Sequence, residues 1–398
     1  MIKFADNKRM LKYILVLLLI VSPLGSIQAE NLRDVLKDAY NFFPDIKKSE
    51  SDLKNAKKDV TISKTDFLPS IDFSASQGKN ISKSHPDTSR IDVTEIHPTT
   101  FDLDITQPLS YTKAISLKQA KNTLKISRLQ NSSVTQNVLF RASKAYYTVL
   151  KDYFLLDVSK KNEENLIKKL EAAEKRFEFR DVTKTDVFQA KASLAEATSK
   201  RIEAENNLDI SISDFKTAVG RLPNINWYDD SDENVTDANP KDWGKFGELP
   251  SLPSSLDKSI EIGLEKNPDF NQLRYKYENS KFDIKKSTLG FAPELSLSGS
   301  IAKSLDSSRT VERKDSYSVT AEVTVPIFNK GHNILNLEKS KNSAISVLKS
   351  MESEKLNLLF QIKSSWKKIE STKSSIDSLK LSVESNIMAV DGVTQEAG

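Results

Sequence analysis

The side chains best suited to catalysis or metal binding are few and widely separated in this sequence. The chain has 398 residues, no Cys and three His, namely His85, His97 and His332. No H-E-x-x-H or comparable spacing brings these His together, and neither a Gly-rich phosphate loop nor a G-x-S-x-G motif occurs. Acid pairs such as Glu163-Glu164 are interpreted as solvated surface charge. We therefore predict a protein that is not an enzyme and requires no metal and no cofactor.

Residues 1–29 have the pattern of a secretory signal peptide. Basic residues precede the apolar stretch Tyr13–Val21, and Ala29 supplies a small residue for cleavage. The alternative is an uncleaved anchor, but the apolar stretch is short for a helical span. Four basic residues less Asp6 give this segment +3 of the chain's net charge of +4, which leaves +1 for the remainder. That remainder is too weakly basic for nucleic-acid binding.

One unit of about 220 residues occurs twice along the chain. Phe43-Pro44-Asp45-Ile46 recurs as Asn267-Pro268-Asp269-Phe270, at an offset of 224 residues. Phe67-Leu68-Pro69 recurs as Phe291-Ala292-Pro293 at the same offset. A segment rich in Pro and acidic residues separates the two copies and is interpreted as a linker. The predicted divisions are a signal peptide at 1–29, a first repeat at 30–220, a linker at 221–255 and a second repeat at 256–398.

Two hydrophobic periods occur within each repeat. A period of two predicts strand pairs at 67–108 and 291–328, each around a long polar loop, 79–97 and 303–316. A period of 3.5 predicts coiled-coil helices, and the stretch from Pro108 to Gly220 contains no internal Gly or Pro to interrupt them. The expected elements are a short first helix in each repeat, a helical hairpin at 112–220 and a long helix at 332–396.

The predicted strands have one apolar and one polar face, which two architectures would explain. Two soluble hairpins lying on a core would give this alternation. Four strands are too few to close a barrel, but an oligomer that shares one barrel would remove the exposed strand edges. Residues alone leave both architectures open.

The duplicated order of short helix, strand pair and long helical hairpin after a signal resembles the TolC-like outer-membrane efflux protein family. The motifs that carry the resemblance are Phe43-Pro44-Asp45-Ile46, Asn267-Pro268-Asp269-Phe270, Pro69, Pro293, Gln107-Pro108-Leu109 and Val325-Pro326-Ile327-Phe328-Asn329-Lys330-Gly331. The resemblance implies a mainly α fold with membrane β-strands, in which long coiled-coil hairpins form an α-barrel. Each protomer of a homotrimer would add four strands to a twelve-stranded β-barrel.

The resemblance also implies a function and a location. The protein would lie in the outer membrane, in contact with lipid, with its helices in the periplasm. It would be the passive exit duct of a tripartite efflux or type I secretion system. Its partners would be a periplasmic adaptor and an inner-membrane ABC or proton-driven pump. The alternative function is a soluble periplasmic coiled-coil scaffold that binds partners.

Two sets of polar residues are candidate sites. Carboxylates on the predicted strands cannot face lipid cheaply, which assigns them to the barrel lumen. The polar residues where the helix pair reverses would be an ordinary solvated turn, but the resemblance implies a tip that contacts an adaptor. The lumen set is Asp72, Asp102, Asp104 and Glu322, and the tip set is Arg176, Arg180, Asp181, Thr183 and Asp186.

Two departures from the family's pattern accompany these assignments. Arg180 stands where the family usually has Gly in the tip turn. At an offset of 220 residues Glu178 corresponds to Gly398, so the returning helix of the second hairpin has no counterpart. We expect from this that the sequence is a fragment or an interrupted reading frame.

Overall fold

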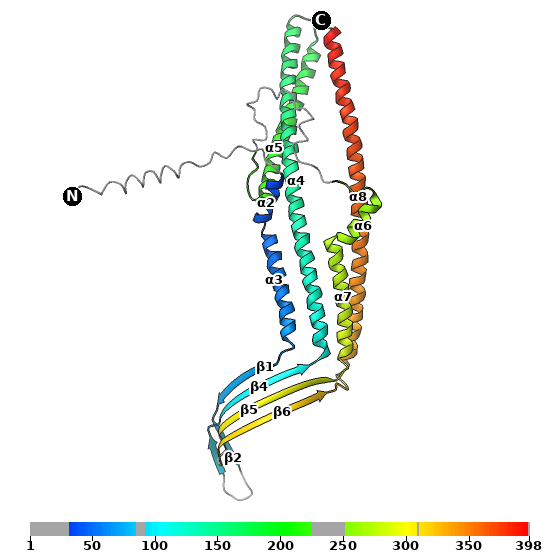
Figure 1. Ribbon diagram of the computed structural model, residues 1–398. Helices are drawn as coiled ribbons and strands as arrows, with labels where there is room; N and C mark the ends of the chain where they lie inside the picture. The colour runs from blue at the N-terminus through cyan, green and yellow to red at the C-terminus, as the bar shows by residue number, and fades with distance from the viewer. Residues whose placement is uncertain (1–31, 85–91, 225–250, 309, 397–398) are drawn as a thin grey trace, which may run out of the picture. The chain divides into compact units, whose positions relative to one another are not determined.

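The structure is a computed structural model that describes residues 32–84, 92–224, 251–308 and 310–396. The predicted signal and most of the predicted linker lie outside these residues. The helices are α2 (Leu32–Phe42), α3 (Pro44–Thr65), α4 (Tyr111–Glu178), α5 (Lys184–Val219), α6 (Leu256–Lys266), α7 (Pro268–Leu289) and α8 (His332–Glu396). The strands are β1 (Ser70–Gln77), β2 (Asn80–Ser84), β3 (Asp92–Ile96), β4 (Thr99–Leu109), β5 (Glu294–Ser308) and β6 (Val311–Thr324) (Figure 1).

The duplicated sequence produces helices of matching length. Helices α2 and α6 both have 11 residues, and α3 and α7 both have 22. Pro44 and Pro268 each begin the second of these helices, because the first helical position has no hydrogen bond to lose. The long helices that follow the strands, α4 and α8, have 68 and 65 residues.

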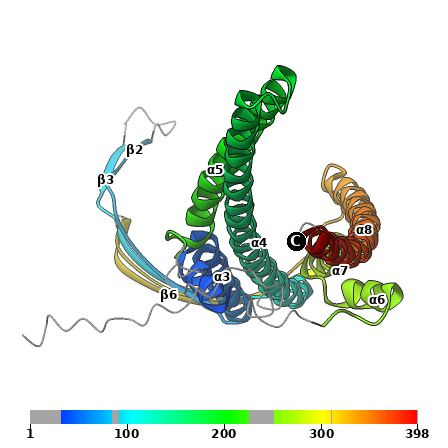
Figure 2. The same ribbon diagram turned by 90° about the horizontal axis from the view of Figure 1, so that it is seen from above.

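The chain forms two compact units, which we describe separately. The first contains the described parts of Met1–Ile46 and Val134–Ser251. Its core is formed where α2 and α5 pack on α4, and Figure 2 shows α4 and α5 side by side. The fully buried side chains include Tyr146 and Phe215, at 2% and 0% exposure. The buried residues of α5 include a set with the 3.5-residue spacing that predicted coiled-coil helices, namely Val187, Ala190, Ala197, Leu208 and Phe215.

The end of α5 is held against α2 by a close approach of the backbone. Gly220 caps α5 in the left-handed region at φ 91°, and a Cβ there would lie 2.3 Å from the Phe42 ring. Only Gly meets both conditions without strain. Next to it, Arg221 Nε donates to Asp38 Oδ2 at 2.8 Å. The start of the first repeat is thereby joined to the end of its hairpin.

The second unit is built on one antiparallel sheet with the order β1-β4-β5-β6. The central pairing of β4 with β5 joins the two repeats edge to edge (Figure 1). The register aligns Leu103 with Phe73 on one side and with Ile301 on the other, so apolar side chains share one face. Hydroxyl and carboxylate side chains share the opposite face, as the period of two predicted.

The two long polar loops predicted inside the strand pairs are corrected by the structure. Within 79–97, β2 and β3 pair as a separate two-stranded sheet. Within 303–316, β5 and β6 continue almost to the turn, and Lys303 lies opposite Asp315. Such an opposite-charge cross-strand pair supports a polar strand. The loop prediction was wrong because polar residues occur in strands as well as in loops, and the strand pairing continues through these polar segments.

Helices α6, α7 and α8 complete the second unit. Helix α7 packs along α8, and α6 docks where Gly263 allows Ile362 to approach, since a Cβ there would lie 2.4 Å from Ile362 Cδ1. The start of α4 meets α7 through polar contacts such as Gln119 Nε2 to Asp283 Oδ1 at 2.6 Å. Among the described helices, none has a stretch long and apolar enough to cross a membrane.

Candidate functional site

The hairpin tip between α4 and α5 closes through a left-handed residue. Arg180 has φ 57°, its N–H donates to Phe177 O at 3.0 Å, and the Asp181 N–H donates to Arg176 O at 2.9 Å. This pair of bonds is the Schellman pattern, which usually places Gly at the left-handed position. Arg180 therefore adopts the backbone of the Gly that it replaces. Its strain is of the order of 1 kcal/mol.

The returning helix α5 begins with a reciprocal cap between Thr183 and Asp186. The Asp186 N–H donates to Thr183 Oγ1 at 3.3 Å, and Thr183 N–H and Oγ1–H donate to Asp186 Oδ2 at 2.8 and 2.7 Å. The Thr183 hydroxyl and N–H, with a smaller effect of the Arg176 charge, hold the pKa of Asp186 below its ordinary value of 3.8. Asp186 therefore stays ionised at the start of α5, where the helix dipole favours negative charge.

The structure places four of the five predicted tip residues in two separate pairs, and the fifth, Arg180, forms the turn. Arg176 Nε lies 2.7 Å from Asp181 Oδ2, apart from the Thr183–Asp186 cap. Sequence reasoning missed the aromatic residues beside them, because it looked for charge. Phe179 is 83% and Phe188 58% exposed. The tip thus offers apolar surface rimmed by fixed charges.

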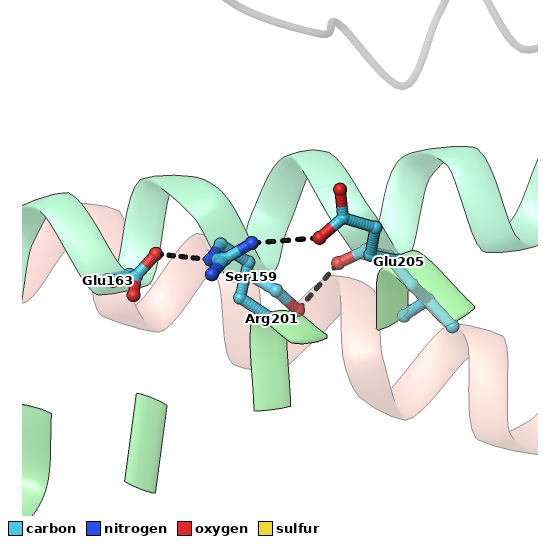
Figure 3. A network of polar contacts seen from close by, with 5 residues as sticks. Ser159, Glu163, Arg201 and Glu205 are labelled. Carbon is cyan, nitrogen blue, oxygen red and sulfur yellow. Dashed lines mark hydrogen bonds and ion pairs between the residues drawn. The ribbon is translucent and has the colours of Figure 1, made fainter. Parts of the chain in front are cut away.

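An ion pair crosses the α4–α5 seam in the middle of the hairpin (Figure 3). Arg201 Nε lies 2.7 Å from Glu163 Oε2 on α4, and Arg201 Nη1 lies 2.9 Å from Glu205 Oε2 on α5. The side chains of Arg201 and Glu163 are only 27% and 17% exposed. The interpretation of Glu163 as solvated surface charge was therefore wrong. The sequence does not show which residue of α5 faces it.

The polar face of the sheet carries the predicted lumen residues. Asp72 lies directly opposite Asp104, Asp102 lies opposite Ser74, and Glu322 lies opposite Ser296. Hydroxyl pairs accompany them on this face, such as Ser300 with Ser318 at 2.7 Å. Lys314 also lies on it, opposite Ser304. The face is hydrophilic and mainly acidic.

The opposite face of the same sheet is apolar and uncovered. Phe73, Ile301 and Val319 are 69%, 47% and 83% exposed. Within the described part of the chain, the outer edges of β1 and β6 have no partner strand. Among the described residues, no group of His, Cys, Asp or Glu could hold a metal ion. The geometry therefore offers one apolar and one hydrophilic sheet surface.

Comparison with known proteins shows which proteins this chain is similar to. Residues 35–221 match the family model described as outer membrane efflux protein. Outer membrane protein TolC of Escherichia coli is 23% identical over 383 residues, which cover 93% of this chain and 74% of TolC. Taken with the duplicated fold, these matches decide which family the chain resembles. Its first repeat matches the outer membrane efflux protein family, and its likeness to TolC extends over most of both repeats.

Further matches point to the same family. Alkaline protease secretion protein AprF of Pseudomonas aeruginosa is 21% identical over 327 residues, which cover 80% of this chain. The chain spans 65% of the length of AprF. The solved structure of CusC superposes with a TM-score of 0.72 at 14% identity, over 87% of this chain and 77% of CusC. The chain therefore has the mainly helical fold with antiparallel strands of the TolC-like channels.

These matches settle the class and location of the protein. The family consists of channel proteins and not of enzymes. The chain is an outer-membrane protein whose helical part lies in the periplasm.

Proposed function

We propose that this chain forms a passive exit duct through the outer membrane for a tripartite efflux or type I secretion system. The observation that carries the proposal is the two-faced sheet, with an apolar face suited to lipid and an acidic, hydroxyl-rich face suited to a water-filled lumen. We include type I secretion in the proposal because the relative AprF is named as a protease secretion protein. The comparisons give no support to the soluble scaffold that the sequence left open as an alternative.

The duct would be a homotrimer in which three sheets close one twelve-stranded barrel. The free edges of β1 and β6 support this proposal, since closure removes unpaired strand edges. The long helices support it as well. Phe140 on α4, Ile210 on α5 and Phe360 on α8 are 73%, 67% and 72% exposed, and neighbouring copies would cover them in an α-barrel.

Cysteine cross-linking tests the shared barrel directly, because the chain has no Cys of its own. Ser74 of β1 is replaced by Cys and paired in turn with Cys at Ser316, Ser318 or Thr320 of β6. Oxidation in outer-membrane preparations should give, for at least one pair, covalent dimers and trimers and no larger species. The single variants should stay monomeric in SDS. Only monomers from every pair would contradict the proposal.

The hairpin tip would be where a periplasmic adaptor docks, with an inner-membrane ABC or proton-driven pump behind it. The exposed Phe179 and the fixed charges of Arg176 and Asp181 support a protein contact, because a rigid aromatic group with a polar rim is typical of interfaces. A photo-crosslinker at Phe179 should capture an envelope protein, whereas one at exposed Lys168 in α4 should not. Equal labelling from both positions would contradict tip docking.

A further inference from the structure

The four points at which the strands meet the helices share one feature. Each carries an aromatic ring within four residues of a strand end, and each ring is exposed. The rings and their exposed fractions are Phe67 before β1 at 46%, Tyr111 after β4 at 81%, Phe291 before β5 at 44% and Phe328 after β6 at 83%. Their recurrence at every junction is more than scattered surface hydrophobicity, which is ordinary.

The strand register brings these junctions to one end of the sheet, where the strands meet the helices. Leu109 at the end of β4 lies opposite Leu295 at the start of β5, and Glu294 lies opposite Thr324 at the end of β6. Figure 1 shows this end of the sheet, where β1, β4, β5 and β6 connect to the helices. The apolar face of the sheet ends there, and polar helices begin.

Lysines accompany the rings at all four junctions. We name the four rings with these lysines the junction band. Between these five lysines and the neighbouring strand ends, the acidic residues are Asp66 and Glu294, so the band is positively charged. Three of the lysines have partners. Lys113 contacts Asp66 O, Lys286 contacts Ser116 Oγ at 3.1 Å, and Lys285 Nζ lies 5.9 Å from the centre of the Phe282 ring. The lysines are Lys64, Lys113, Lys285, Lys286 and Lys330.

We infer that the junction band binds anionic phospholipid headgroups at the bilayer surface next to the helices. Aromatic rings suit the boundary between hydrocarbon and water, and lysines there attract phosphate. The charge argues for an anionic lipid specifically, because rings alone would accept any headgroup. Each lysine near an anionic surface strengthens binding by about fivefold at low salt. The inference rests on the proposed membrane-inserted duct.

Lipid retention by the purified full chain tests the inference. The protein in detergent is exchanged into micelles doped with equal phosphatidylglycerol and phosphatidylcholine, and retained lipids are counted by native mass spectrometry. The wild type should retain phosphatidylglycerol by at least about fivefold over phosphatidylcholine, which is the preference that a single lysine gives. The variant Lys64→Gln/Lys285→Gln/Lys330→Gln should lose most of this preference. The control Lys168→Gln/Lys169→Gln, which removes two exposed lysines of α4, should keep it.

Three outcomes would overturn the inference, and they differ from a failure of the duct itself. The wild type could retain both lipids equally, or the triple variant could keep the full preference. Inorganic phosphate at about 50 mM could remove the preference where KCl of equal ionic strength does not, which would reassign the lysines to a free anion. If the protein conducts in neutral bilayers but shows no lipid preference, only the inference fails. If it does not insert at all, both fail.

Discussion

Thr183 is the residue on which the start of α5 depends most directly. Its hydroxyl both accepts from Asp186 N–H and donates to the Asp186 carboxylate. Replacement of Thr183 by Ala should destabilise the tip by about 1 kcal/mol, the usual cost of a lost N-cap. Trypsin cleavage at Arg180 should then become about fivefold faster. The control Thr185→Ala, at an exposed position two residues further along, should leave the cleavage rate unchanged. Equal cleavage rates in the two variants would contradict the capping role of Thr183.

The Asp186 carboxylate makes the tip sensitive to acid. Its pKa is lowered in the folded state by the Thr183 hydrogen bonds, so the stability it contributes is full above its unfolded pKa near 3.8. That contribution is lost as the pH falls through the lower folded value. An environment-sensitive dye on Phe179→Cys should report a transition below pH 3.8. Asp186→Asn should abolish it and Asp181→Asn should not. A transition that survives in Asp186→Asn would assign the acid response to another group.

At the scale of elements, the seam between α4 and α5 is set by Arg201 and Glu163 as well as by heptad packing. Their charge-assisted contact is mostly shielded from water, so its coupling should exceed that of a surface pair. A double-mutant cycle with Glu163→Gln and Arg201→Gln should give a coupling of about 1 kcal/mol in thermal unfolding. The exposed i,i+4 pair of Glu196 and Lys200 should give about 0.4 kcal/mol. Equal couplings would remove the special role of the seam.

The sheet gives a matched test of its two faces at neighbouring positions of β6. Val319 lies on the apolar face and Ser318 on the hydroxyl-rich face. Val319→Arg should destabilise the inserted protein by about 2–4 kcal/mol, because the guanidinium would face hydrocarbon. Ser318→Arg should be tolerated, because it would face water. The measurement is the fraction of each variant that resists SDS at room temperature; equal losses would contradict a lipid face.

The sequence predicts local order well and contacts between elements less well. The alternation through Leu103 and the long helices without internal Gly or Pro depend on neighbouring residues, and both were predicted. Glu163 was not, because its partner Arg201 depends on how two helices are aligned. The strand character of Lys303 was also missed, because it depends on Asp315 across the turn. The assignment of Asp72 and Asp104 to a lumen stays a prediction, since it needs the closed oligomer.

At the scale of the whole molecule, closure of three sheets would gather the acidic faces around one axis. Carboxylates lining a pore favour cations over anions. The duct should therefore select K⁺ over Cl⁻. Replacing the four lumen carboxylates by their amides should move the permeability ratio toward one. The residues to change together are Asp72, Asp102, Asp104 and Glu322.

The central claim is that copies of this chain form a water-filled duct through the outer membrane. Its most direct test is the conductance of the protein, extracted from outer membranes in detergent, across a planar lipid bilayer with a KCl gradient. We expect discrete conductance steps and a reversal potential of the sign that K⁺ selectivity gives. A folded protein that leaves the membrane without detergent as a monomer, and that produces no steps, would contradict it.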